Sequence, residues 1–181
     1  KEVILSGGDP LVLDDDKLAA LCRDLETIPH IKWLRIHTRL PVVLPARITP
    51  SLLAWMRNSR FRITMVIHAN HANELGTDEM IALEALRNIN ITLLNQSVLL
   101  KNINDNASSL IALSHRLHDA GVIPYYLHLL DQVQGGLHFD VKRETACQFI
   151  DNMRDKLPGY LVPRLVVEEK GKSSKTAISY I

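Results

Sequence analysis

Three lysines, Lys170, Lys172 and Lys175, lie close together near the end of the sequence, after the last long apolar segment. A lysine held in a desolvated pocket can bond covalently to an aldehyde cofactor such as pyridoxal phosphate. The same run also suits a solvated basic loop, which is the ordinary interpretation of such a composition. It is not a phosphate-binding P-loop, because the upstream glycine of that pattern is missing.

A second candidate site is the sequence Gly7-Gly8-Asp9-Pro10, which follows an apolar segment. Two glycines let the backbone approach a ligand closely and present its N–H groups to a carboxylate or a phosphate. The alternative is a tight turn in which Asp9 caps the next helix. Spacing alone favours this turn.

Polar side chains also follow the apolar segments further along the chain. His68 and His71 are not spaced as a helical metal pair, so hydrogen bonding to a polar ligand is a better interpretation than metal ligation. Asn95 and Gln96 could bind ribose hydroxyls or a carboxylate, or could satisfy loop backbone, and the sequence leaves both open.

Two carboxylates end apolar segments in the second half of the chain. Asp131 closes the most apolar run and is suited to a cationic substrate group, although a turn aspartate before Gly135-Gly136 is equally consistent. Glu168 follows the last apolar run and begins the polar stretch that leads to Lys175.

The elements that must position these residues alternate between strand and helix. Nearly continuous apolar runs predict parallel strands at residues 3–6, 33–38, 63–68, 91–94, 124–129 and 161–167. Helical patterns lie between them, around residues 18–25 and at 52–58, 78–88, 108–120 and 144–156. This alternation predicts an α/β fold, either a partial (β/α) barrel or an open doubly wound sheet, in one domain.

Composition excludes several classes of protein. The chain has 181 residues, 46% hydrophobic and 23% charged, with a net charge of +1, so neither a nucleic acid nor a membrane partner is expected. The apolar runs are too short to span a bilayer, and Cys22 and Cys147 are too far apart for a disulfide framework or an all-cysteine metal site. No secretory signal precedes the first strand, and a cytoplasmic protein is expected. Because Lys1 stands at the edge of a predicted strand, we expect a segment of a longer protein.

Together the motifs resemble one family, the lysine 2,3-aminomutases among the radical S-adenosylmethionine enzymes. The resemblance covers essentially the whole chain. Its motifs, in order, are SGGDPL at residues 6–11, HTRLPVVLPARIT at 37–49, HANHANE at 68–74 and NQSVLLK at 95–101. The segment LHLLD at 127–131, with His138-Phe139, is similar to the branch that makes (R)-β-lysine for modification of elongation factor P.

The resemblance implies a fold, a reaction and three cofactors. The fold is a partial barrel of the radical S-adenosylmethionine type. The reaction converts L-lysine to β-lysine by a radical 1,2-amino shift on a pyridoxal-phosphate aldimine. It is started when a [4Fe–4S] iron–sulfur cluster cleaves S-adenosylmethionine, and the cofactors carry the hard chemistry.

The resemblance also assigns roles to residues. Those implied to face S-adenosylmethionine are Gly7, Gly8, Asp9, His68 and Gln96. Lys175 stands at the position of the lysine that binds pyridoxal phosphate, in preference to Lys172. Asp131 and Glu168 stand where two acidic residues hold the side-chain ammonium of the substrate.

No metal ligand is assigned within these residues. The cluster motif CxxxCxxC is absent, so residues 1–181 are expected to be a core segment, with the cluster loop before it and a C-terminal part after it. The alternatives are an aminomutase for another amino acid and a non-catalytic barrel remnant. A homo-oligomer is left open.

Overall fold

The computed structural model describes residues 1–130, 137–168 and 175–178. The chain divides into two compact units. The first unit contains Lys1–His68, Glu74–Leu94 and Ala120–Val122, and the second contains Ala69–Asn73, Asn95–Asp119 and Ile123–Ile181. Strand β4 (Thr92–Val98) begins in the first unit and ends in the second. The prediction of a single domain stays a prediction.

Three parallel strands form the sheet of the first unit. They are β1 (Glu2–Leu5), β2 (Trp33–His37) and β3 (Arg62–His68), with β2 paired to both others. Alternate residues of a strand point to opposite faces, and one face is apolar, as Leu34, Ile36 and Met65 are fully buried. The opposite face carries polar residues, among them Arg35, which pairs with Glu2 at 2.9 Å.

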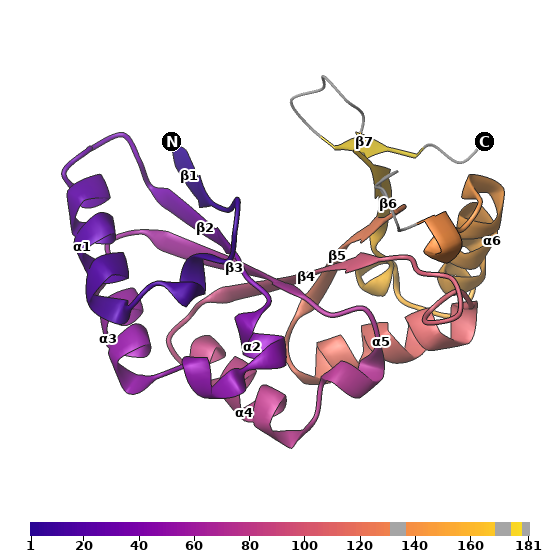
Figure 1. Cartoon of the computed structure of the whole chain (residues 1–181), viewed down its shortest axis with the longest axis horizontal. Helices are drawn as coiled ribbons and strands as arrows, with labels where there is room; N and C mark the ends of the chain where they lie inside the picture. The colour runs from indigo at the N-terminus through magenta and orange to yellow at the C-terminus, as the bar shows by residue number, and fades with distance from the viewer. Residues whose placement is uncertain (131–136, 169–174, 179–181) are drawn as a thin grey trace. The chain divides into compact units, whose positions relative to one another are not determined.

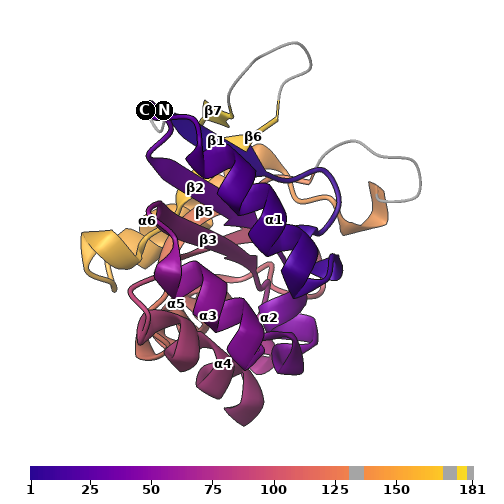
Figure 2. The same ribbon diagram turned by 90° about the vertical axis from the view of Figure 1, so that its left-hand side faces the viewer.

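Helices cover the apolar face of this sheet, as Figure 2 shows for α1 (Asp15–Glu26) and α3 (Pro50–Asn58). Acidic residues in the first turn of α1 complement the positive end of its helix dipole. The hydroxyl of Thr49 caps α3 by accepting a hydrogen bond from the Leu52 amide at 3.0 Å. The other helical elements of this part of the chain are α2 (Leu40–Val43), α4 (Thr77–Arg87), η1 (Pro10–Val12), η2 (Pro45–Arg47) and η3 (Ala72–Glu74).

The second unit is built around β5 (Ile123–His128) and β6 (Arg164–Val167), which are parallel, and β7 (Thr176–Ala177), which is antiparallel to β6. Helices α5 (Ala107–Asp119) and α6 (Arg143–Arg154) pack on these strands (Figure 1). Short 3-10 turns, η4 (Leu137–Phe139) and η5 (Gly159–Leu161), complete it. The core of this unit contains Leu99, Leu110, Leu127, Val141, Ala146, Ile150, Met153, Leu157, Leu161, Leu165 and Ile178.

The alternation of strands and helices predicted from the sequence is confirmed, with three corrections. The strand predicted at residues 161–167 begins only at Arg164, because residues 159–161 form η5 and Pro163 has no N–H to donate to a ladder. The strand predicted at residues 91–94 continues to Val98. The single helical turn α2 was not predicted.

No helix in the described part of the chain combines the length and the apolar character that crossing a membrane requires.

Candidate functional site

Lys175 lies at the centre of a polar cluster in the second unit. Its Nζ atom is 3.0 Å from Nε2 of His128 and 3.3 Å from Oε1 of Glu168. The same Nζ atom lies over the ring of Tyr126, 5.4 Å from the ring centroid. A ring nitrogen, a carboxylate and an aromatic face therefore surround one amino group.

Strand register explains why these four residues meet. In the antiparallel pair β6–β7, Val166 stands opposite Ala177 and Val167 opposite Thr176, so the next positions outward are Glu168 and Lys175. In the parallel pair β5–β6, His128 stands beside Val166. Because side chains alternate between faces, Tyr126, His128, Glu168 and Lys175 all belong to the same face of these strands.

Burial ranks the partners of Lys175. His128 is 8% exposed, whereas the side chain of Glu168 is 55% exposed and that of Lys175 is 25% exposed. An ion pair with a carboxylate this exposed contributes little to stability. The buried His128 ring, held edge-on against Tyr126 at 81°, is the better fixed neighbour of the amino group.

The sequence predicted two members of this cluster, Glu168 and Lys175, and the structure brings them together. It did not predict roles for His128 and Tyr126. The signal for them is weak: two polar-tipped side chains at alternate positions of an otherwise apolar strand. Three of the candidate site residues lie outside the described residues, namely Asp131, Lys170 and Lys172.

In the first unit, both oxygens of the Asp9 carboxylate accept hydrogen bonds from the protein. Its Oδ1 atom accepts hydrogen bonds from the Leu11 amide at 3.0 Å and the Thr38 hydroxyl at 2.7 Å. Its Oδ2 atom accepts one from the Arg39 amide at 2.7 Å. The capping interpretation is confirmed, since Asp9 is the N-cap of η1, and the same carboxylate also ties this loop to the end of β2.

Gly7 and Gly8, which precede Asp9, have backbone conformations that favour glycine. Their φ angles are +85° and +119°, and both residues are exposed. A Cβ atom added at either position would meet no atom within 4 Å. The loop therefore leaves open space beside its own backbone, as close approach of a ligand would require.

The two amide side chains in the middle of β4, Asn95 and Gln96, have different surroundings. The side chain of Asn95 accepts a hydrogen bond from the Ala69 amide at 2.9 Å and donates one to the Ala69 carbonyl at 3.0 Å, so it satisfies backbone. Gln96 differs, because its Oε1 atom is buried without a hydrogen-bond partner among the described residues. A buried acceptor without a donor is costly, so Gln96 is the stronger candidate for contact with a ligand.

The two candidate histidines, His68 and His71, lie in different units. His68 is the last residue of β3 and belongs to the first unit with Gly7, Gly8 and Asp9. His71 belongs to the second unit, where its Nδ1 atom accepts a hydrogen bond from the Asn73 amide at 3.2 Å. His71 therefore has a local role in its loop.

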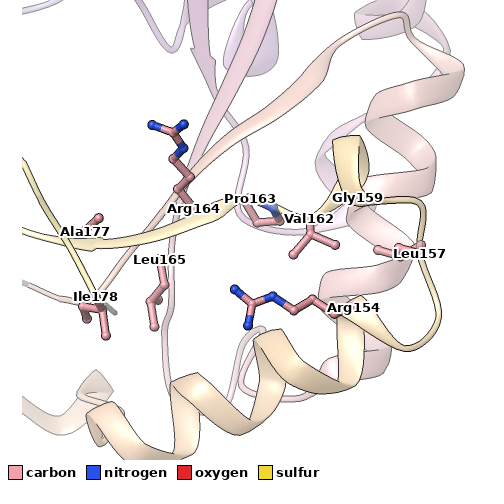
Figure 3. Close-up of a pocket in the computed structure, with 9 residues that line it drawn as sticks. All are labelled: Arg154, Leu157, Gly159, Val162, Pro163, Arg164, Leu165, Ala177 and Ile178. Atoms are coloured by element: carbon pink, nitrogen blue, oxygen red, sulfur yellow. The ribbon is translucent and has the colours of Figure 1, made fainter. Parts of the chain in front are cut away.

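A cavity of about 370 Å³ also lies in the second unit (Figure 3). Its lining is mostly apolar, and in Figure 3 the side chain of Arg154 reaches towards it from the end of α6. Arg154 is paired with Asp151 at 2.9 Å. None of the residues predicted for a site lines this cavity, and we assign it no role in the chemistry.

Comparison with known proteins supports the motif assignment. No family model matches the chain. It is 51% identical over 177 residues to a protein from Escherichia coli (strain K12) named L-lysine 2,3-aminomutase, covering 98% of this chain and 52% of that protein. A protein of the same name from Haemophilus influenzae is 49% identical over 176 residues, covering 97% and 52%. One from Clostridium subterminale is 35% identical over 178 residues, covering 98% and 42%. The chain spans about half the length of the first two relatives.

Solved structures show the fold. Streptococcus suis SuiB bound to S-adenosylmethionine matches with a TM-score of 0.60 at 16% identity, covering 93% of this chain and 39% of that one. A domain of a pyruvate-formate lyase-activating enzyme from Bacteroides vulgatus matches with a TM-score of 0.59 at 12% identity, covering 92% and 98%. The predicted fold class, a partial (β/α) barrel of the radical S-adenosylmethionine type, is confirmed, as is the resemblance to lysine 2,3-aminomutases.

Proposed function

We propose that the protein containing this chain is an isomerase of the lysine 2,3-aminomutase type, which converts L-lysine to β-lysine. The observation that carries the proposal is the position of Lys175, held on one strand face between His128 and Glu168. The high identity of the chain to proteins named L-lysine 2,3-aminomutase supplies the reaction.

Lys175 suits attachment to the aldehyde of pyridoxal phosphate. Its amino group lies in a partly buried cluster rather than in bulk solvent, and the neighbouring groups restrict its position. When bound, pyridoxal phosphate and S-adenosylmethionine supply the radical amino shift, and the residues of this chain bind and orient them.

For S-adenosylmethionine, we propose contacts with Gly7, Gly8, Asp9, His68 and Gln96. The open space beside Gly7 and Gly8 and the unpartnered Oε1 atom of Gln96 support this proposal. The carboxylate of Asp9 also connects the glycine loop to Thr38 and Arg39. The [4Fe–4S] cluster would take its cysteine ligands from outside this chain.

For the substrate, we propose that Glu168 and Asp131 bind the side-chain ammonium of L-lysine. Glu168 already accepts a cationic partner, the ammonium of Lys175, at 3.3 Å. A carboxylate pair matches a substrate that carries a second positive charge, and it would disfavour an acidic amino acid.

The finer assignment is to the branch that serves elongation factor P. It is supported by identities of 47–51% to three relatives, including those from Escherichia coli and Haemophilus influenzae, against 33–37% to five others of the same name. In this proposal the enzyme acts in the reducing cytoplasm, where its cluster and thiols stay reduced.

The test uses the full-length protein with its cluster reconstituted under anaerobic conditions. Supplied with S-adenosylmethionine, pyridoxal phosphate and a reductant, it should convert L-lysine to β-lysine and leave L-glutamate and L-ornithine largely unchanged. Asp131→Asn should weaken lysine binding by about 30-fold or more while leaving S-adenosylmethionine binding intact, because an unpaired buried charge costs about 2–5 kcal/mol.

Three outcomes would contradict the proposal. Conversion of a different amino acid in preference to lysine would make the protein another aminomutase. No product from a protein with a full cluster and bound S-adenosylmethionine would favour the non-catalytic alternative. Unchanged lysine affinity in Asp131→Asn would show that Asp131 is a turn residue.

A further inference from the structure

Of the two polar neighbours of the Lys175 amino group described above, the ring nitrogen of His128 is the nearer. Nε2 of His128 stands 3.0 Å from Nζ, compared with 3.3 Å for the carboxylate of Glu168. A lysine amino group can donate to a ring nitrogen in both its protonated and its neutral form. When it donates to Nε2, a neutral imidazole carries its own proton on Nδ1.

The ring of His128 is also well fixed. The residue is 8% exposed and ends β5, where the Leu129 amide that follows donates to the Val166 carbonyl at 2.9 Å. Tyr126, two residues earlier on the same strand face, packs edge-on against it with ring centroids 5.7 Å apart. A buried ring that packs against Tyr126 can fix the position of a flexible lysine, whose side chain has four rotatable bonds.

We infer that His128 is a positioning residue for Lys175: its Nε2 atom holds the amino group in place and thereby determines which lysine of the basic segment receives pyridoxal phosphate. This inference rests on the proposed function, because it assumes that the cofactor is attached in this segment. It assigns His128 a function beyond packing, which the sequence motifs alone did not indicate.

The role follows from what attachment requires. The neutral amino group must attack the aldehyde carbon along a narrow range of directions, and a C=N bond then replaces the C=O bond as the aldehyde oxygen leaves as water. Positioning of reacting groups is worth large factors in rate. Lys170 and Lys172 are nearby in sequence and chemically equivalent to Lys175. A fixed acceptor beside the Lys175 amino group would favour this nucleophile over the other two lysines of the segment.

The test compares two amide variants of the full-length protein after removal of its cofactor. In His128→Gln, the side-chain oxygen reaches about as far as Nε2 and can accept the same hydrogen bond, whereas in His128→Asn it reaches only as far as Nδ1. Pyridoxal phosphate is added, the visible absorbance of the attached cofactor is followed, and borohydride reduction with peptide mapping locates it. Neither measurement depends on turnover.

We expect His128→Gln to take up the cofactor within about threefold of the wild-type rate, with the label on Lys175. His128→Asn should be slower by about tenfold or more, the equivalent of one lost hydrogen bond, and part of its label should appear on Lys170 or Lys172. His118→Asn is the matched control, because it makes the same chemical change at an exposed position of α5 and should behave as wild type.

The outcomes separate the inference from the proposed function. No label on Lys175 in the wild-type protein overturns the cofactor assignment itself. Label on Lys175 at equal rates in wild type and both variants leaves the proposed function intact and overturns the role of His128. Equal losses in Gln and Asn, in folded proteins, show that His128 acts by packing, which also overturns it. If the Asn variant does not fold, His128→Phe, which keeps a planar ring but has no acceptor, replaces it.

Discussion

The glycine loop of the first unit and the β6–β7 ends of the second were both expected to meet cofactors, but they use their charged groups differently. The carboxylate of Asp9 accepts three hydrogen bonds from the protein, which involve both of its oxygens. The amino group of Lys175 has neighbours, but its side chain stays 25% exposed and within reach of a partner. In the first region the charge builds the shape of the loop, and in the second it is available for chemistry.

This difference indicates which part of each region would contact a ligand. Around Asp9, the loop offers a ligand open space beside the backbone of Gly7 and Gly8. Around Lys175, the side chain itself is the reactive group, and its neighbours hold it. A motif residue can therefore be essential because it stabilises the loop, as Asp9 does, or because it reacts with the ligand, as we propose for Lys175. Measurements of stability and of ligand attachment distinguish these two roles.

The largest expected effect is the loss of the reactive amine. Lys175→Ala in the full-length protein should abolish the visible band of attached pyridoxal phosphate, while Lys172→Ala keeps it. The free energy of unfolding should change by less than about 1 kcal/mol, because a partly exposed ion pair contributes little. Absorbance with borohydride mapping and denaturant unfolding provide the two measurements. Strong destabilisation of the Lys175→Ala protein would show that Lys175, like Asp9, has a structural role, and would contradict the proposed difference between the two regions.

Asp9→Ala should show the reverse pattern. It removes the acceptor for two backbone amides and one hydroxyl, so the free energy of unfolding should fall by about 3 kcal/mol. Attachment of pyridoxal phosphate to the folded fraction should persist. The matched control is Asp14→Ala, because the Asp14 side chain forms an exposed pair with Lys17 and its loss should change stability by less than about 0.5 kcal/mol. Equal stability of the two variants would show that the Asp9 network carries no energy.

The Asp9 turn could be predicted from the sequence because all the residues that indicate it are adjacent in the chain. Two glycines, an aspartate and a proline in succession predict a turn with a capping carboxylate whatever the rest of the fold does. The role of His128 could not be predicted in this way, because its partner, Lys175, is 47 residues away in the sequence. Periodicity places His128 in an apolar strand but contains no information about which distant residue stands opposite, and that is decided by strand register.

The errors in the predicted elements have similar local causes. Leu161 and Val162 are apolar, which favours a strand, but Pro163 interrupts the ladder and the strand starts after it. Asn95 and Ser97 are polar, which argues against a strand, but each forms a hydrogen bond with the buried Ala69 carbonyl, so β4 continues through them. In both cases the pattern of hydrogen-bond partners, which a single sequence does not show, outweighed polarity.

The glycine loop offers a smaller test of the same contrast. Gly8→Ala should destabilise the protein by about 1–3 kcal/mol, because φ is +119° at this position and residues with a side chain rarely adopt that backbone conformation. Gly159 of the second unit is the matched control, since an added Cβ atom meets nothing within 4 Å and its φ is ordinary. Gly159→Ala should leave stability unchanged or raise it by about 0.5 kcal/mol. Thermal unfolding of both variants would show whether backbone shape distinguishes the two regions.

The smallest effect separates the two cysteines, Cys22 of the first unit and Cys147 of the second. Burial, with a smaller contribution from Glu26, raises the pKa of Cys22 to about 11. A thiol with that pKa is about one part in a thousand thiolate at pH 8, and the thiolate is the form that iodoacetamide attacks.

Native protein should therefore be alkylated at Cys147, which is half-buried, well before Cys22, with peptide mass spectrometry as the measurement. The raised pKa also sets the sign of a pH effect. The unfolded thiol loses its proton near pH 9, below the folded one, so this group lowers stability as the pH rises from about 9 to 11 and leaves it unchanged below that range. Equal alkylation of both cysteines at pH 8 would contradict the burial of Cys22. Cys22→Ala should remove the part of the alkaline destabilisation that comes from this thiol, since no group with a raised pKa is then left at the site.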